Sequence, residues 1–369
     1  FAPFQQDPAF AGLYDTFFPK GRAPEVGETV TLPDHARTLE TLAQTEGEAF
    51  YRGELADRMD RFSRETGGCL RKEDLAAYQA EWVEPLHVDY RGYDVWEIPP
   101  NGHGITALMA LNIMQGFQLE QRETVDSWHK QIEAMKLAFS DAQHYVADPR
   151  FMHTRVEDLL SPAYADQRRS LIGEQALLPH WGKPFSGGTV YLCAADGEGN
   201  MVSFIQSNFR GFGSGIVIPG TGIALNDRGN NFSLDPAMDN CLAPGKKPYH
   251  TIIPGFLTKD GQAVGPFGVM GGFMQPQGHL QVLLNTLDFH MNPQAALDAP
   301  RWQWIEGKKV EVEAQAGPEI IEGLRQRGHE IVVKEDRTSF GRGQIIWRRE
   351  DGTLVGATEP RTDGTVAAY

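Results

Sequence analysis

A threonine stands at the head of an apolar run, directly behind two glycines. Gly187 and Gly188 precede Thr189, and the apolar run continues to Ala195. The turn-forming stretch 196–200 follows, and residues 201–207 have the pattern of a returning strand. We therefore predict a β-hairpin over residues 189–207. This hairpin constrains the chain to a fold with a buried strand that begins at Thr189.

The position of Thr189 also has a chemical consequence. Scission of the peptide between Gly188 and Thr189 would give an N-terminal threonine whose α-amine lies beside its own hydroxyl and can act as its base. A free α-amine has a pKa of about 7.7–8, so a modest lowering makes it a competent base near neutral pH. The alternative is an ordinary threonine that favours a strand.

The pattern of secondary structure changes close to Thr189. Residues 1–188 are mainly helical in pattern, whereas residues 189–369 show short strands. This change is a plausible junction between two polypeptides of one processed enzyme. The sequence predicts helices over 36–43, 48–66, 72–78, 105–114, 125–145, 278–286 and 318–327, a hairpin over 86–98, a loop over 99–104 and a strand over 263–270.

Composition excludes several classes of function. The net charge of −15 argues against binding to nucleic acid or to an anionic membrane, because both need clustered cations. No apolar run approaches the ~20 residues that span a bilayer. The three cysteines are scattered, and the histidines lack a metal-ligand spacing. We therefore expect no metal and no cofactor, and we expect Asp94, Glu97 and the acids of helix 125–145 on solvated faces.

Further motifs follow in a fixed order and resemble the gamma-glutamyltranspeptidase family of N-terminal-nucleophile hydrolases over residues 7–369. This resemblance implies an α+β fold, the αββα four-layer sandwich, and a precursor that cuts itself before Thr189. Residues 1–188 would then be the C-terminal part of the large subunit and residues 189–369 the small subunit. The motifs lie at 74–78, 88–93, 133–148, 196–200, 212–222, 225–227, 231–233, 244–248, 270–272 and 356–361.

The resemblance also implies the partners of the chain. These are a small-molecule amide substrate and the second subunit from the same precursor, as one heterodimer or as a dimer of heterodimers. The chain starts at Phe1 without a methionine or a signal peptide. We expect an N-terminal stretch of the family to be absent, and with it the arginine that grips the substrate carboxylate. We expect a cytoplasmic location, with a periplasmic one as the alternative.

Four residues are the predicted catalytic group. Thr189 is the nucleophile, and Ser207, at the end of the partner strand, is placed to hydrogen-bond its hydroxyl. The diglycine Gly271 and Gly272 follows an apolar strand, and its N–H groups are predicted to hold the oxyanion. The alternatives are a solvent-facing serine at a strand end and a plain strand-to-helix turn.

Five residues are predicted to contact the substrate, and several depart from the family pattern. The family's acidic residue that binds the substrate α-amino group falls at Asn231, which cannot neutralise an ammonium. Arg228 stands where the family has a neutral or acidic group, and His250 and Thr251 replace paired serines. The family's asparagine near the nucleophile falls at Phe209, so Asn208 is the candidate substitute. Alternatively, Arg228 makes a surface pair and His250 is a satisfied core histidine; a packing role is expected for His103.

The predicted function is an autoprocessing threonine amidohydrolase or acyltransferase. The first candidate substrate is a gamma-glutamyl amide such as glutathione. The rival is an amide of another small acid, such as oxamate or the glutaryl side chain that cephalosporin acylases cleave. A hypothesis from another class is a degenerate relative that only binds a small acid.

Overall fold

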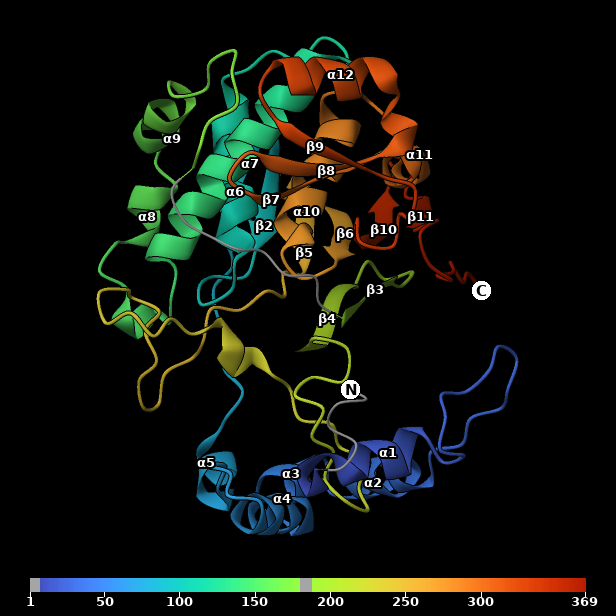
Figure 1. The fold of residues 1–369 in the computed structure, drawn as a ribbon. Coiled ribbons are helices and arrows are strands. Elements are labelled where there is room, and N and C mark those ends of the chain that lie inside the picture. The colour runs from blue at the N-terminus through green and yellow to red at the C-terminus, as the bar shows by residue number, and fades with distance from the viewer. Residues whose placement is uncertain (1–6, 180–187) are drawn as a thin grey trace. The chain divides into compact units, whose positions relative to one another are not determined.

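The computed structural model describes residues 7–179 and 188–369, and the chain divides into two compact units (Figure 1). The first unit contains the chain up to Trp82 together with Arg210–Asp227, and the second contains Val83–Phe209 and Arg228–Tyr369. All predicted site residues belong to the second unit. The predicted junction before Thr189 is a different kind of boundary, because it is a peptide bond to be cut and not a border between compact units. It stays a prediction.

The first unit is built from short helices around a small apolar core. Leu55, Met59 and Ile218 are central to this core. The predicted helix over 48–66 is two helices, because the chain passes closely over itself at Gly53: a Cβ there would lie 2.8 Å from the Ala49 Cα. The elements are η2 (Pro8–Phe10), α1 (Ala11–Phe17), α2 (Pro33–Gln44), α3 (Glu48–Tyr51), α4 (Glu54–Glu65) and α5 (Lys72–Ala77).

The second unit is organised around a six-stranded sheet with the strand order β1-β2-β5-β6-β10-β11. All neighbouring strands in this sheet are antiparallel. The predicted hairpin over 86–98 and the predicted strand over 263–270 are both present. The strands are β1 (Leu86–Tyr90), β2 (Tyr93–Glu97), β5 (Gly255–Lys259), β6 (Gln262–Met270), β10 (Arg342–Arg348) and β11 (Leu354–Thr358).

Helices cover one face of this sheet. α6 packs on β1 and β2, α10 on β6, and α11 on β10 and β11, while α7 packs against α6 (Figure 1). α6 is apolar on nearly every side and is almost fully buried, as expected for a central helix. The elements are α6 (Gly104–Gln115), α7 (Val125–Tyr145), η3 (Pro149–Phe151), α8 (Val156–Leu159), α9 (Pro162–Arg169), α10 (Met274–Leu287) and α11 (Pro293–Asp298).

The predicted hairpin at Thr189 forms a separate two-stranded sheet, β3 (Gly188–Ala195) and β4 (Met201–Phe209). A Cβ on Gly268 of β6 would meet the Tyr191 ring of β3, whereas the adjacent Val269 contacts α10 at Gly278. Because adjacent residues of a strand point to opposite faces, β3 and β4 lie on the face of the large sheet that the helices leave open. The outward side chains Val190, Leu192, Val202 and Phe204 are 45–53% exposed.

A third, smaller sheet completes the second unit. β7 and β8 are antiparallel, and β9 joins β8 in parallel. α7 and α10 both pack against β7, and α12 packs against α7. The elements are η4 (Arg228–Asn231), β7 (Trp302–Glu306), β8 (Lys309–Glu313), η5 (Ala314–Ala316), α12 (Pro318–Gln326) and β9 (Glu330–Lys334).

Candidate active site

The Thr189 hydroxyl is held by the partner strand. Thr189 lies opposite Ser207 in the register of β3 and β4 and is only 5% exposed. Its Oγ1 donates a hydrogen bond to Ser207 Oγ at 3.1 Å. The sequence therefore predicted this pair correctly as neighbours, and the catalytic role of both stays a prediction. Gly188 is the first residue of β3, whereas Gly187 lies outside the described residues.

The register of β3 and β4 shifts at the predicted scission point. Thr189 pairs with Ser207 and Gly188 pairs with Phe209, so Asn208 is the extra residue of a β-bulge. Phe209 has a left-handed backbone with φ of 77°. Its N–H donates to Ser207 Oγ at 2.8 Å. The bulge interrupts the strand alternation by which Asn208 would face away from the site, and the substrate role of Asn208 stays a prediction.

Gly271 and Gly272 form the sharp connection from β6 to α10. Their φ values are 141° and 61°, in the region that favours glycine. Their carbonyls accept hydrogen bonds from the Met274 and Gln275 N–H groups at 3.1 Å. A Cβ on Gly271 would lie 3.2 Å from the Gly341 Cα, so the backbones pass closely here. The oxyanion role of the diglycine stays a prediction.

A buried network of charges supports this connection. Arg301 donates to the Phe340 and Gly341 carbonyls and, at 2.8 Å, to Glu359. Glu359 accepts the Gly343 N–H, and Arg361 joins it to Glu313. Burial lowers the pKa of Arg301 to about 10. Since β10 pairs with the end of β6, this network fixes the backbone beside Gly271.

Arg228 lies beside the strand end that carries Ser207. Its guanidinium carbon is 5.4 Å from the centre of the Phe209 ring, and its Nη1 donates to Thr251 Oγ1 at 2.9 Å. Arg228 is only 5% exposed, so the alternative of a surface pair is wrong. Thr251 is fully buried. The structure thus brings Arg228 and Thr251 together near the nucleophile's strand, and their substrate roles stay predictions.

His250 and His103 come together through their backbones. The His103 N–H donates to the His250 carbonyl, and the His103 Nε2–H donates to the Thr251 carbonyl, both at 2.9 Å. His103 is fully buried among aromatic rings, as expected for a packing role. Burial and then the Arg228 charge lower the pKa of His250 to about 3. Asn231 donates from Nδ2 to the Tyr249 carbonyl at 3.0 Å, and its Oδ1 has no hydrogen-bond partner among the described residues; its substrate role stays a prediction.

Several acidic residues that were expected on solvated faces are buried. Glu97 is buried and lies 2.6 Å from His279 Nδ1, and Glu133 and Asp141 of α7 are also buried. Burial raises the pKa of Asp141 to about 6. The expectation of solvated faces is therefore wrong for these three residues. His279 pairs with Glu97. The Leu177 N–H, far from α7 in sequence, donates to Glu133; helical spacing alone does not reveal such contacts.

One group of buried side chains has the composition of a metal site. His129, Glu133 and His329 place their ligand atoms within 4.8 Å of one another. However, His129 Nε2–H donates to the Gly173 carbonyl, so His129 Nδ1 accepts the 2.8 Å hydrogen bond from His329 Nε2. Lys136 lies 2.7 Å from Glu133 Oε1.

The charges around this cluster also oppose a cation. Burial, together with the nearby charges of Lys136, Arg327 and Lys308, lowers the pKa of His329 to about 3. Lys136 already neutralises the Glu133 carboxylate, so this cluster offers a divalent ion no net negative charge. The cluster therefore holds itself together by hydrogen bonds and does not fit a metal.

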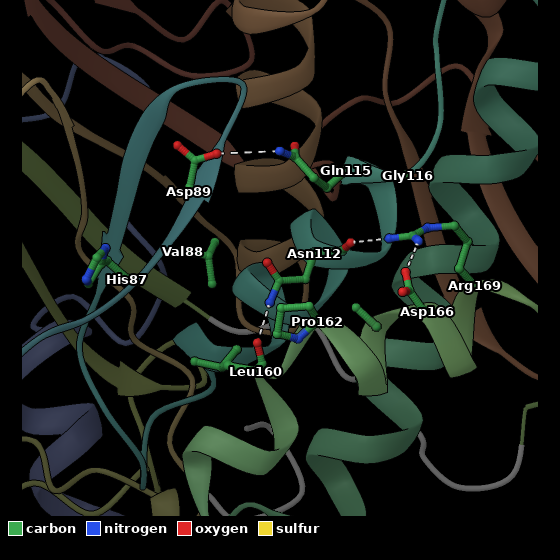
Figure 2. Close-up of a pocket in the computed structure, with 11 residues that line it drawn as sticks. His87, Val88, Asp89, Asn112, Gln115, Gly116, Leu160, Pro162, Asp166 and Arg169 are labelled. Carbon is green, nitrogen blue, oxygen red and sulfur yellow. Dashed lines mark hydrogen bonds and ion pairs between the residues drawn. The ribbon is translucent and has the colours of Figure 1, made fainter.

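A cavity of about 540 Å³ lies elsewhere in the second unit, between β1, the end of α6 and α9 (Figure 2). Its lining contains none of the predicted site residues. Arg169 is bound to the carbonyls of Ile113 and Asn112, and Asn112 in turn donates to the Leu160 carbonyl. Arg169, the cation in the wall of this cavity, thus already caps the C-terminal end of α6.

None of the helices within residues 7–179 and 188–369 combines the length and the apolar character that a membrane crossing requires.

Comparison with known proteins decides the family. The family model described as Gamma-glutamyltranspeptidase matches residues 2–369. The chain belongs to the gamma-glutamyltranspeptidase family. The resemblance inferred from the motifs is thereby confirmed.

Solved and curated relatives agree with this assignment. The crystal structure of a cephalosporin acylase from Bacillus halodurans is 62% identical, with a TM-score of 0.96 over 99% of this chain and 67% of that one. The glutathione hydrolase-like YwrD proenzyme of Bacillus subtilis is 36% identical over 95% of this chain and 68% of its own length. The oxamate amidohydrolase proenzyme of Klebsiella pneumoniae is 33% identical over 97% and 69%.

The structural match also confirms the predicted fold class, the N-terminal-nucleophile hydrolase sandwich. This chain spans about two thirds of the length of each of these three relatives. Two of them are named as proenzymes, and their names describe hydrolases of amides.

Proposed function

We propose that the chain is an amide hydrolase whose nucleophile is Thr189 Oγ1 and whose base is the α-amine of the same residue. The observation that carries this proposal is the position of the Thr189 hydroxyl. It lies 3.1 Å from Ser207 Oγ, and Thr189 directly follows Gly188, the first residue of β3. A nucleophile needs a base within hydrogen-bond reach, and an N-terminal threonine provides one in the same residue.

The reaction proceeds in two halves. Thr189 Oγ1 attacks the amide carbonyl and passes its proton to the α-amine, while the N–H groups of Gly271 and Gly272 hold the oxyanion. The C–N bond then breaks, and the leaving amine takes the proton. Water attacks the resulting ester, the α-amine accepts a proton from it, and the acid leaves as Thr189 Oγ1 regains a proton. Ser207 keeps the nucleophile oriented in both halves.

The precursor is cut by the same hydroxyl. Thr189 Oγ1 attacks the Gly188 carbonyl, and the C–N bond breaks, so that the peptide becomes an ester and the freed α-amine takes the proton of the hydroxyl. Water then hydrolyses the ester and releases the Gly188 carboxylate and the Thr189 hydroxyl. The β-bulge at Asn208 supports this step, because it distorts the strand pairing beside the peptide to be cut. The two products stay together as a heterodimer, alone or paired into a dimer of heterodimers.

We infer that the acyl group is a small anionic acid without an α-amino group, such as glutarate. Arg228 attracts a carboxylate and repels an ammonium, and Asn231 offers no negative charge to a gamma-glutamyl amine. Similarity to a cephalosporin acylase supports this inference. The second candidate is a gamma-glutamyl amide, supported by similarity to a glutathione hydrolase-like protein and by the free acceptor Asn231 Oδ1.

Turnover of two matched anilides tests the proposal. We expect a higher kcat/KM for glutaryl-p-nitroanilide than for gamma-glutamyl-p-nitroanilide, with oxamate as a third substrate. Arg228→Met should remove the preference, because it removes the cation and keeps the bulk. A preference for the glutamyl anilide would favour the second candidate, and binding without turnover of any amide would favour a degenerate relative.

A further inference from the structure

The last residue of β4 combines features that normally exclude one another. Phe209 is a bulky residue with a left-handed backbone, φ 77°, and its side chain is only 1% exposed. The left-handed region is unfavourable for bulky residues, and such strain persists only where the surroundings enforce it. Phe209 also lies opposite Gly188, across from the peptide that is to be cut.

The backbone of Phe209 serves the nucleophile. Its N–H donates to Ser207 Oγ at 2.8 Å, and Ser207 Oγ accepts the Thr189 hydroxyl at 3.1 Å. This N–H belongs to the peptide that follows the bulge residue Asn208, and the left-handed φ of Phe209 sets the direction in which the ring and the next residue leave that peptide. With an extended backbone at this position, the same peptide could not hold Ser207 while the ring kept its present place.

The ring of Phe209 serves Arg228. The guanidinium carbon lies 5.4 Å from the ring centre, within the range of a cation–π contact. Thr251 Oγ1 holds the guanidinium through Nη1. The ring and the Thr251 hydroxyl thus fix the cation that we assign to the substrate carboxylate.

We propose that Phe209 is a positioning residue that couples the two halves of the site: its N–H holds Ser207 and through it Thr189, its ring aligns Arg228, and its left-handed backbone allows both contacts at once. This proposal rests on the proposed function of Thr189 and Arg228. It makes two separable claims: kcat depends on the left-handed backbone at this position, and KM for an anionic acyl group depends on an aromatic ring there.

Substitutions at Phe209 separate these claims, with glutaryl-p-nitroanilide as the substrate. Phe209→Gly and Phe209→Asn accept the left-handed backbone but lack the ring, so KM should rise about 5-fold while kcat changes less than 2-fold. Phe209→Val opposes that backbone and lacks the ring, so kcat should fall about 10-fold or more and KM should also rise. Phe209→Tyr keeps an aromatic ring, so its kcat and KM should stay close to those of the parent.

Two controls keep the test sharp. Phe209→Leu replaces Phe209→Val if the latter does not fold, which its thermal midpoint reveals. Tyr93→Asn removes a cation–π contact with Lys259 on β2 and β5 and should leave both constants unchanged.

The outcomes distinguish this proposal from the proposed function. If Thr189→Ala is inactive while Phe209→Gly, Phe209→Asn and Phe209→Val all lower kcat to the same extent, Phe209 acts only by filling space and the coupling is overturned. A KM in Phe209→Gly, Phe209→Asn and Phe209→Val equal to that in Phe209→Tyr would overturn the role of the ring. If Thr189→Ala retains activity, the proposed function itself fails.

Discussion

Two buried polar clusters in the second unit have similar ingredients and opposite character. Around Thr189, hydroxyls and a cation lie beside a β-bulge and a left-handed phenylalanine. Around Glu133, the two histidines hydrogen-bond to each other and Lys136 donates to Glu133, and the backbone at Gly173 and Leu177 supplies further hydrogen bonds. The second cluster fixes a loop, whereas we propose that the first holds the nucleophilic hydroxyl.

The two clusters differ in their backbone and not in their burial. Burial of polar groups occurs in both clusters, so burial alone does not mark reactivity. Backbone distortion and a junction between two sheets are found only at the first of these two clusters. Strain of this kind is expected where function enforces it. The predictions below test whether the two clusters differ as this comparison requires.

The largest expected effect is that of Thr189→Ala. Removing the nucleophile should lower amide turnover by about 10⁴-fold or more and leave the precursor uncut. Thr189→Ser keeps a hydroxyl and an α-amine and should keep partial activity. Anilide hydrolysis and gel analysis measure the two effects. An alanine variant that retains turnover would show that this cluster is as inert as the one at Glu133.

The next largest effect concerns the buried charges beside the diglycine. Arg301→Met leaves buried Glu359 without one of its partners and should destabilise the protein by about 3–5 kcal/mol. Denaturant unfolding measures this change. Glu311→Gln breaks the partly exposed pair with Lys334 and should cost less than about 1 kcal/mol. Similar losses for both variants would contradict the assigned support of the Gly341 backbone.

A smaller effect is expected at the diglycine itself. Gly271→Ala adds a Cβ against the Gly341 backbone at a φ that disfavours alanine, so kcat should fall about 10²–10³-fold. Gly261→Ala is the matched control, because Gly261 also has a positive φ but has open space around it. That control should lower thermal stability and leave kcat intact. An unchanged kcat in Gly271→Ala would remove the oxyanion role.

The smallest effect concerns the second cluster and pH. Burial lowers the pKa of His129 to about 4 and that of His329 to about 3. Since both folded-state pKa values lie below the unfolded value of about 6.5, stability present above pH 6.5 is lost as pH falls. At pH 5 each histidine should remove about 2 kcal/mol.

Replacement of one histidine checks this sign. His329→Gln should reduce the loss of unfolding free energy between pH 7 and pH 5 by about 2 kcal/mol, while the kcat of the amide hydrolase at pH 7 stays unchanged. An identical pH dependence in the variant and the parent would show that His329 does not titrate in this range.

Local patterns predicted much of the secondary structure. α7 has the predicted bounds, and the pairing of Thr189 with Ser207 follows from the hairpin spacing. α10 begins at Met274 rather than near Gly278, so Gly278 lies inside the helix. A glycine is needed there because a Cβ at position 278 would lie 2.5 Å from the Val269 side chain. Tertiary packing therefore overrides the low helix propensity of glycine.

The parts that could not be predicted depend on distant partners. Glu133 and Lys136 have the spacing of an exposed ion pair on a helix, and only the loop at Leu177 and His329 bury them. The predicted hairpin ends at residue 207, and the side chain of Phe209 gives no sign of a left-handed backbone. Its left-handed backbone arises from the β-bulge opposite Gly188 and from the packing of its ring under Arg228.

The central claim is that scission before Thr189 turns an ordinary hydroxyl into a nucleophile. Intact-mass measurement of the purified protein, with N-terminal sequencing of each fragment, tests it most directly. We predict two fragments, one of which begins at Thr189 and accounts for residues 189–369. An uncut chain that hydrolyses the anilide at full rate would contradict the account.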